Sequence, residues 1–174
     1  RYTGRFSRGN VSRPFTKEGD TEEHGLYVRF LPDPQIFETT VFDYDVLLGR
    51  MREQAFLNAG VRIILRDERG EEIIENDLCY EGGIRSFVSY LGSIKHCNML
   101  HPNVIYMSET REDSSCAEVA LQYNDTYADT LITFANNIKT VEGGTHETGF
   151  KAALTRVIND YAHRCGALKD SDSP

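Results

Sequence analysis

The sequence predicts an α+β fold in which helices pack on one face of a mostly antiparallel sheet. With 174 residues, 40% of them hydrophobic, the chain has enough apolar side chains for one substantial core. Its hydrophobic spacing predicts, in order, strand, helix, hairpin, helix, three strands and helix. This order lacks the regular strand and helix alternation of a parallel sheet, which favours the α+β class.

The N-terminal segment is predicted to contain two strands. Residues 1–9 suggest a short strand and turn, and residues 25–30 suggest a strand with Leu26 and Val28 on one face. Two prolines within residues 31–34 then interrupt regular structure. We therefore expect a domain boundary after residue 31.

The middle of the chain predicts two helices around a hairpin. Residues 44–57 carry apolar side chains at helical spacing, with Asp43 as a suitable N-cap. The segment DERG, residues 67–70, joins two apolar alternating runs and therefore predicts a hairpin turn. A shorter helix is expected over residues 84–91.

Three strands and a long helix complete the expected fold. The strands are predicted over residues 103–108, 116–123 and 130–136, and the helix has Thr145 as N-cap and Gly166 as its stop signal. One stripe of this helix is apolar and is expected to face a core; its residues are Phe150, Leu154, Val157, Ile158 and Tyr161.

The remaining faces of the long helix carry cations, namely Lys151, Arg156, His163 and Arg164. They can be ordinary solvated surface, or they can face a polyanion. The formal net charge of −8 argues against a protein that grips DNA with its whole surface. A local basic lining remains compatible with this charge.

Gly143 and Gly144 directly precede the long helix. Free backbone N–H groups at a helix N-terminus can bind phosphate, which gives the pair one possible role. Two glycines also suit a tight loop or a hinge, and the sequence favours this second interpretation.

No other pattern predicts chemistry within the chain. The four cysteines lie far apart without metal-binding spacing and are expected to be free thiols, and the five histidines show no paired ligand spacing. We therefore expect no metal site and no catalytic residue. The sequence has neither a membrane-length apolar run nor a signal-peptide pattern, so we expect a cytoplasmic protein without membrane interactions.

Several collinear segments carry a family resemblance, among them GLYVRFLPDPQIFETT, REQAFLNAGVRIILRDER and EGGTHETGFKAALTRVINDYA. From about residue 25 to residue 166 the chain resembles the transducer domain in the ATPase region of gyrase B, the ATP-hydrolysing component of the type IIA topoisomerase DNA gyrase. The resemblance implies that residues 1–31 are the last strands of an incomplete nucleotide-binding domain of the GHKL class. Residues 32–174 would be the transducer domain, incomplete at its C-terminus, whose fold is shared with a ribosomal protein domain.

The resemblance also implies where ATP chemistry takes place. The complete gyrase B protein would bind ATP and Mg²⁺, but the family's catalytic glutamate, magnesium-binding asparagine, glycine-rich lid and phosphate-binding lysine have no counterpart here. This chain alone is therefore expected to be inactive and to bind no cofactor. Leu26 and Val28 would belong to the wall of the adenine pocket, and Leu26 replaces the threonine that is usual in the family.

The partners implied by the resemblance are DNA, the gyrase A protein in a heterotetramer of two gyrase A and two gyrase B chains, and a second gyrase B chain when ATP binds. Lys151 would face a cavity that holds DNA, and Gly143 and Gly144 would let the preceding loop bend. The implied function is to couple ATP binding and hydrolysis to strand passage and negative supercoiling. The alternatives are the B-type component of topoisomerase IV, which decatenates DNA, and a non-enzymatic nucleic-acid-binding module.

Overall fold

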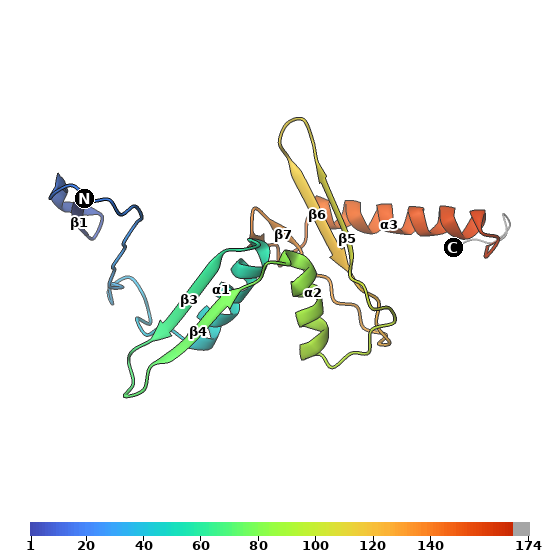
Figure 1. Ribbon diagram of the computed structural model, residues 1–174, viewed down its shortest axis with the longest axis horizontal. Helices are drawn as coiled ribbons and strands as arrows, with labels where there is room; N and C mark the ends of the chain where they lie inside the picture. The colour runs from blue at the N-terminus through green and yellow to red at the C-terminus, as the bar shows by residue number, and fades with distance from the viewer. Residues whose placement is uncertain (169–174) are drawn as a thin grey trace. The chain divides into compact units, whose positions relative to one another are not determined.

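The computed structural model describes residues 1–168 and confirms the α+β class (Figure 1). Every strand pair in this range is antiparallel, and the strands form four two-stranded sheets instead of one continuous sheet. The elements in chain order are β1 Tyr2–Ser7, β2 Asn10–Lys17, α1 Tyr44–Leu57, β3 Arg62–Asp67, β4 Ile74–Cys79, α2 Gly83–Ile94, β5 Ile105–Thr110, β6 Cys116–Leu121, β7 Phe134–Ala135, β8 Ile138–Lys139 and α3 Thr145–Arg164.

The chain divides into two compact units, residues 1–47 and the chain from Leu48 onward. The domain boundary expected after residue 31 stays a prediction. In the first unit, β1 and β2 form a hairpin whose turn residues Arg8 and Gly9 both have positive φ, 48° and 79°. This geometry suits the right-handed twist of a two-residue hairpin. The strand β2 was not predicted from the sequence.

The strand predicted over residues 25–30 is wrong. No described segment pairs with these residues, and Leu26 and Val28 are 86% and 67% exposed. A strand is stabilised by hydrogen bonds to a neighbouring strand. The alternation of apolar residues in one segment does not show whether such a neighbour exists.

The helix α1 covers the predicted residues, and the Asp43 carboxylate accepts a hydrogen bond from the Val46 N–H at 3.0 Å. The core lies between α1, β4 and α2, where Ala55, Phe56, Leu78 and Phe87 are buried. The ring of Phe56 stacks on Tyr80 with centroids 3.7 Å apart and on Phe87 at 5.0 Å. This aromatic stack therefore joins both helices to the end of the hairpin.

The predicted hairpin is confirmed as β3 and β4, and the predicted helix over 84–91 extends to Gly83–Ile94. Ion pairs line the outer face of this hairpin, between Arg62 and Asp77 and between Arg66 and Glu75. The residues that alternate with them along the strands, such as Leu78, have side chains on the opposite face, which points to the core.

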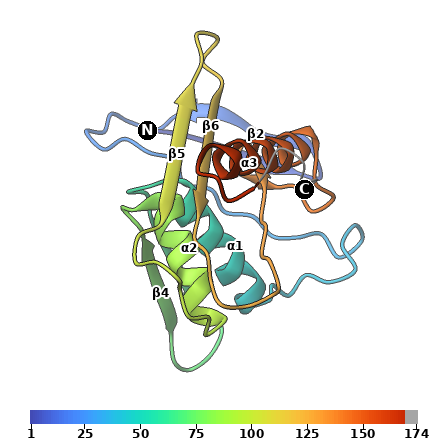
Figure 2. The ribbon, with the colours of Figure 1, turned by 90° about the vertical axis from the view of Figure 1, so that its right-hand side faces the viewer.

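A second hairpin, β5 and β6, packs against α2 at one end and extends away from it at its turn (Figure 2). The guanidinium of Arg85 lies over the Tyr106 ring at 4.1 Å. At the base of the hairpin, the Nε2 atom of His101 accepts a hydrogen bond from the Tyr123 N–H at 3.0 Å, and its Nδ1 lies 2.7 Å from the Asn103 carbonyl. These two contacts fix the orientation of the imidazole ring at the base of the hairpin.

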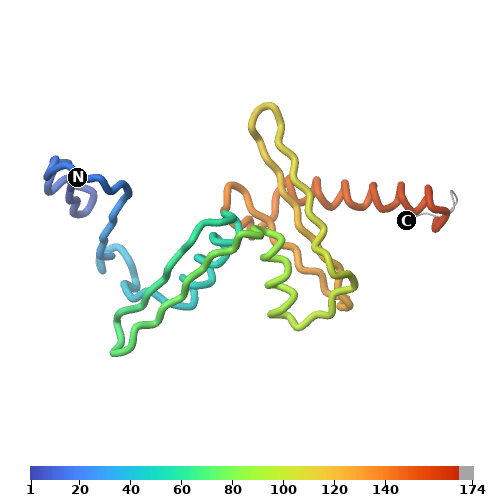
Figure 3. Tube along the Cα trace, viewed as in Figure 1, coloured from blue at the N-terminus to red at the C-terminus, as the bar shows by residue number. Residues whose placement is uncertain are grey.

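The strand predicted over 130–136 is mostly wrong, because only Phe134 and Ala135 pair, with Lys139 and Ile138. Asn136 and Asn137 turn the chain between them with φ angles of 48° and 63°. This turn, drawn in orange in Figure 3, lies beside the end of α1.

The long helix is confirmed as α3, and its predicted stop at Gly166 is confirmed by a φ of 74°. The Gly166 N–H bonds to the His163 carbonyl and the Ala167 N–H to the Ala162 carbonyl, the pattern of a Schellman motif. Thr145 is not the N-cap: it is already helical, and Gly144 holds that position without a side-chain hydrogen bond.

The apolar stripe of α3 does not face a core in the described part of the chain. Val157, Ile158 and Tyr161 are 55%, 46% and 64% exposed, while Phe150 and Leu154 are half-buried. No other described helix or strand packs extensively against α3. Helical spacing of apolar residues identifies the apolar face of a helix, but it does not identify the segment that packs against that face.

Candidate functional site

The candidate site is the loop that joins β8 to α3, together with the first two turns of α3. Gly143 has a φ of 75°, and its N–H donates a hydrogen bond to the Thr140 carbonyl at 3.1 Å. A Cβ atom at this position would lie 2.9 Å from an oxygen of Glu147. Both the backbone conformation and the neighbouring carboxylate therefore favour glycine here.

Gly144 is needed for a different reason. Its backbone is extended, with a φ of 161°, but a Cβ atom would lie 2.8 Å from the Cε1 and Nδ1 atoms of His146. That imidazole is held in place because its Nε2 lies 3.1 Å from the Thr140 hydroxyl, which also bonds to the Thr133 hydroxyl at 2.6 Å. A chain of hydrogen bonds thus ties the start of α3 to residues before the loop.

Lys151 lies about two helical turns beyond this loop and one turn beyond Glu147. Its Nζ donates to the Glu147 carboxylate at 2.6 Å, and its side chain is 58% exposed. The hydrogen bond from Lys151 is the main reason that the pKa of Glu147 is lowered, and the same bond raises the pKa of Lys151. Lys151 is therefore charged and accessible to solvent, but a phosphate group must compete with Glu147 for it.

The position of Glu147 also bears on the glycine pair. Its carboxylate lies against Gly143 in the first turn of α3, where a phosphate at the helix N-terminus would approach. Two anions at this place would repel each other. The geometry therefore favours the loop interpretation of Gly143 and Gly144 over phosphate binding.

Leu26 and Val28 lie in the first unit and are not enclosed by other described residues, as their exposure shows. Within residues 1–168 no group of three or more potential ligands is placed to hold a metal ion. The assignment of Leu26 and Val28 to the adenine pocket therefore stays a prediction. All four cysteines are free thiols. No helix in the described range has the length and hydropathy needed to cross a bilayer.

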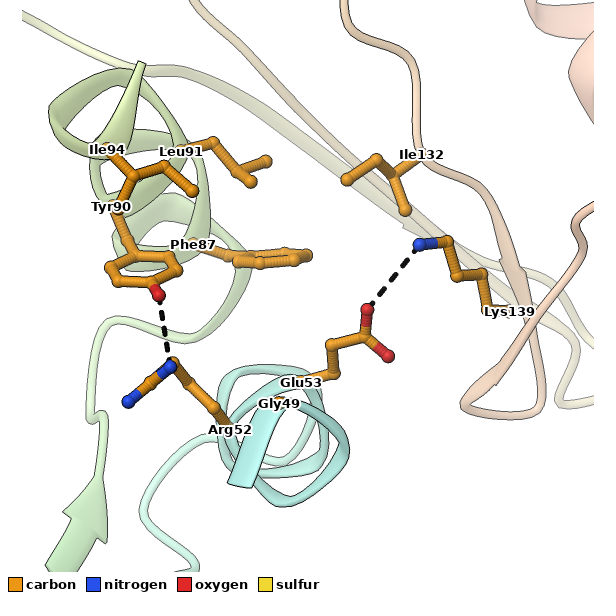
Figure 4. A pocket seen from close by; sticks show the side chains of 9 residues that line it. All are labelled: Gly49, Arg52, Glu53, Phe87, Tyr90, Leu91, Ile94, Ile132 and Lys139. Carbon is orange, nitrogen blue, oxygen red and sulfur yellow. Dashed lines mark hydrogen bonds and ion pairs between the residues drawn. The ribbon is translucent and has the colours of Figure 1, made fainter. Parts of the chain in front are cut away.

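A cavity of about 230 Å³ lies between α1, α2 and the segment around β8 (Figure 4). Its lining includes the charged side chains of Arg52, Glu53 and Lys139, and most of its other side chains are apolar. Sequence reasoning missed this cavity, because it depends on docking of the β7 to β8 turn onto a helix more than 80 residues earlier. The full lining is Gly49, Arg52, Glu53, Phe87, Tyr90, Leu91, Ile94, Ile132 and Lys139.

Comparisons with known proteins all identify the same family, DNA gyrase B. The family model described as DNA gyrase B matches residues 83–174, more than half of the chain. Gyrase B of Clostridium acetobutylicum is 52% identical over 168 residues, which are 96% of this chain and 26% of that protein. Gyrase B of Staphylococcus epidermidis is 50% identical over 170 residues, 97% of this chain and 26% of its own. The chain thus spans about a quarter of the curated relatives that it matches.

Solved structures agree in fold. The 43K ATPase domain of Thermus thermophilus gyrase B, crystallised with an aminocoumarin, superposes with a TM-score of 0.76 at 30% identity, covering 99% of this chain and 46% of that one. Gyrase B of Myxococcus xanthus gives a TM-score of 0.78 at 24% identity, covering 93% of this chain and 47% of that one, and supports the fold alone.

Proposed function

The chain belongs to the DNA gyrase B family, and we propose that it acts as the transducer segment of gyrase B, coupling ATP binding and hydrolysis to DNA strand passage and negative supercoiling. The single observation that supports this role best is the family match, which extends from α2 through α3. The topoisomerase IV alternative is not favoured, because the relatives described above are gyrase B proteins, which are parts of a type II topoisomerase. A non-enzymatic nucleic-acid module is disfavoured by the same match and by the net charge of −8.

In this proposal, the complete gyrase B protein binds ATP and Mg²⁺, works with gyrase A and dimerises when ATP binds, in the cytoplasm. Residues 1–31 are assigned to the end of the nucleotide-binding domain and the residues from 32 onward to the transducer domain. Leu26 and Val28 stay assigned to the adenine-pocket wall of the complete protein. This chain alone is expected to hydrolyse no ATP, so its rate at millimolar ATP should equal that of buffer.

Lys151 is the proposed DNA contact. Its ammonium group is exposed on α3, and its ion pair with Glu147 holds it in place in the absence of DNA. A duplex phosphate that approaches α3 can share or replace the Glu147 carboxylate as the partner of this group. Gly143, with its positive φ, is the position at which a small change of backbone angles would redirect α3.

The test uses complete, reassembled gyrase with the substitution Lys151→Glu. We expect DNA-stimulated ATP hydrolysis and supercoiling to fall several-fold, while the DNA-free ATPase rate and Tm stay near those of the wild type. Lys151→Arg should preserve both activities because it keeps the charge. Lys95→Glu, at an exposed lysine that bonds to the Thr130 hydroxyl, is the control for a general loss of positive charge.

Intact DNA stimulation in Lys151→Glu would remove Lys151 from the proposed DNA contact. The chain alone should bind linear duplex weakly, with a Kd no tighter than roughly 10⁻⁴ to 10⁻⁶ M at physiological salt, because one lysine cannot offset the acidic surface.

A further inference from the structure

We propose that the cavity between α1, α2 and β8 is a binding site for a small aromatic carboxylate. Its apolar wall consists of Phe87, Leu91 and Ile94 from α2, with Ile132 on the opposite side (Figure 4). Gly49 leaves α1 without a side chain at this point, and a Cβ atom there would meet nothing within 4 Å. The walls therefore leave room for an apolar ring.

The charges around the cavity favour an anion. Arg52 and Lys139 line it together with a single carboxylate, Glu53, and Arg50 lies next to that carboxylate. Within the lining, two cations and one anion leave an excess of one positive charge. A cationic ligand would meet this excess and would have to displace Arg50, which bonds to Glu53 at 3.1 Å.

Lys139 is the group best placed to receive the ligand's carboxylate. Its Nζ lies 3.6 Å from Glu53, which is longer than a direct hydrogen bond. The ammonium can therefore turn to a ligand without losing a short bond to Glu53. Arg52 lies apart from Lys139 and is already held by Tyr90 (Figure 4), because it donates to the Tyr90 hydroxyl at 3.1 Å and lies 5.4 Å from that ring's centroid.

The volume of the cavity suits a ligand with one ring. A volume of about 230 Å³ is below the range of roughly 300–1,000 Å³ that is typical of sites for drug-sized molecules. A single ring with one carboxylate matches both the walls and the charge. For so few atoms, we expect a Kd on the order of 1 mM.

The test is a titration of the nitrogen-15-labelled chain with benzoate, with benzamide as the neutral analogue and benzylammonium as the cationic one. Benzoate should bind about tenfold more tightly than benzamide, because a charge-assisted hydrogen bond replaces a neutral one. Its saturable amide shifts should centre on Leu91, Ile94, Ile132 and Lys139. Equal affinity for benzoate and benzamide, or shifts without saturation at these residues, would overturn the proposal.

Two variants test the two parts of the site separately. Lys139→Met should weaken benzoate binding about tenfold and leave benzamide binding unchanged, whereas Lys95→Met, outside the cavity, should change neither. Gly49→Leu should fill the cavity and abolish binding of both ligands while the helix stays folded, because leucine suits a helix better than glycine. Retained benzoate binding in Gly49→Leu would place the ligand elsewhere and contradict the proposal.

Discussion

The side-chain amide of Gln54 donates a hydrogen bond to the main-chain carbonyl of Asn137 at 2.9 Å, although the two residues are 83 positions apart. Arg50 donates to the same carbonyl at 3.1 Å, and the Asn137 amide donates to the Asn58 side chain at 2.9 Å. Polar side chains in and just after α1 thus hold the turn between β7 and β8. The position of Lys139, and with it one side of the cavity, depends on these bonds.

The first prediction concerns Asn137, whose φ is 63°. Asn137→Gly loses the bond to Asn58 but keeps the backbone conformation, and should lower the free energy of unfolding by about 0.5–1.5 kcal/mol. Asn137→Ala loses the same bond and adds a left-handed backbone cost of roughly 1–2 kcal/mol. Urea unfolding of both variants measures the difference. Equal free energies of unfolding for Asn137→Gly and Asn137→Ala would mean that the turn does not require a positive φ at this residue in solution.

The second prediction concerns Gly143. Gly143→Ala should destabilise the second unit by about 1–2 kcal/mol, because alanine is disfavoured at its φ of 75° and its Cβ would displace Glu147. Gly149→Ala, inside α3 where a Cβ atom meets nothing within 4 Å, is the matched control and should stabilise by up to about 1 kcal/mol. Unfolding by urea measures both. Similar effects of the two substitutions would argue against a special role of the loop glycine.

Local signals in the sequence predicted the local parts of the structure. The cap at Asp43, the β3 to β4 hairpin and the stop at Gly166 each depend on residues within one or two turns, so the pattern was sufficient. The strand expected at residues 25–30 needed a neighbour that no described segment provides. Thr145 was one position from the actual N-cap, a usual uncertainty for helix ends.

Two parts of the site were not predicted from the sequence, one of them local and the other non-local. Glycine and charge patterns identified Gly143, Gly144 and Lys151, but not the carboxylate of Glu147 that contacts two of them. The cavity was missed because its walls come from three segments. Contacts between such distant segments leave no periodic pattern in the sequence.

The third prediction concerns Asp67 and acid. Hydrogen bonds from the Arg69 side chain at 2.8 Å and from its N–H at 3.1 Å lower the pKa of Asp67 from 3.8 to about 2. Because the folded-state pKa is the lower one, the stabilisation is complete above the unfolded value of 3.8 and is lost as the pH falls towards about 2. A carboxyl-carbon NMR titration should place the midpoint of Asp67 near 2.

Asp67→Asn should remove this contribution to the acid dependence of hairpin stability. Glu71→Gln, in the same loop, is the control for loss of a negative charge. A titration midpoint of Asp67 near 3.8 would show that Arg69 does not hold the carboxylate in solution.

The fourth prediction concerns Leu26 in the complete gyrase B protein. If its position lies at the adenine, Leu26→Thr adds a hydroxyl that can form one net hydrogen bond, worth about 0.5–1.5 kcal/mol. The affinity for nucleotide, measured by calorimetry, should increase by a factor between a few-fold and roughly tenfold. Leu31→Thr, at a residue that is 92% exposed, is the control. Unchanged affinity in Leu26→Thr would remove this residue from the adenine pocket.

The short connections within each strand pair affect how the chain folds. The turn of β1 and β2 and the turn of β7 and β8 have two residues each, so these pairs can close within about 1–10 μs, the usual time for hairpin formation. The bonds from α1 to Asn137 close a loop of about 80 residues, and loop closure of this length is entropically costly before any contact forms. We therefore expect the β7 to β8 turn to reach α1 late in folding, so that Gln54→Ala accelerates unfolding while leaving the refolding rate nearly unchanged.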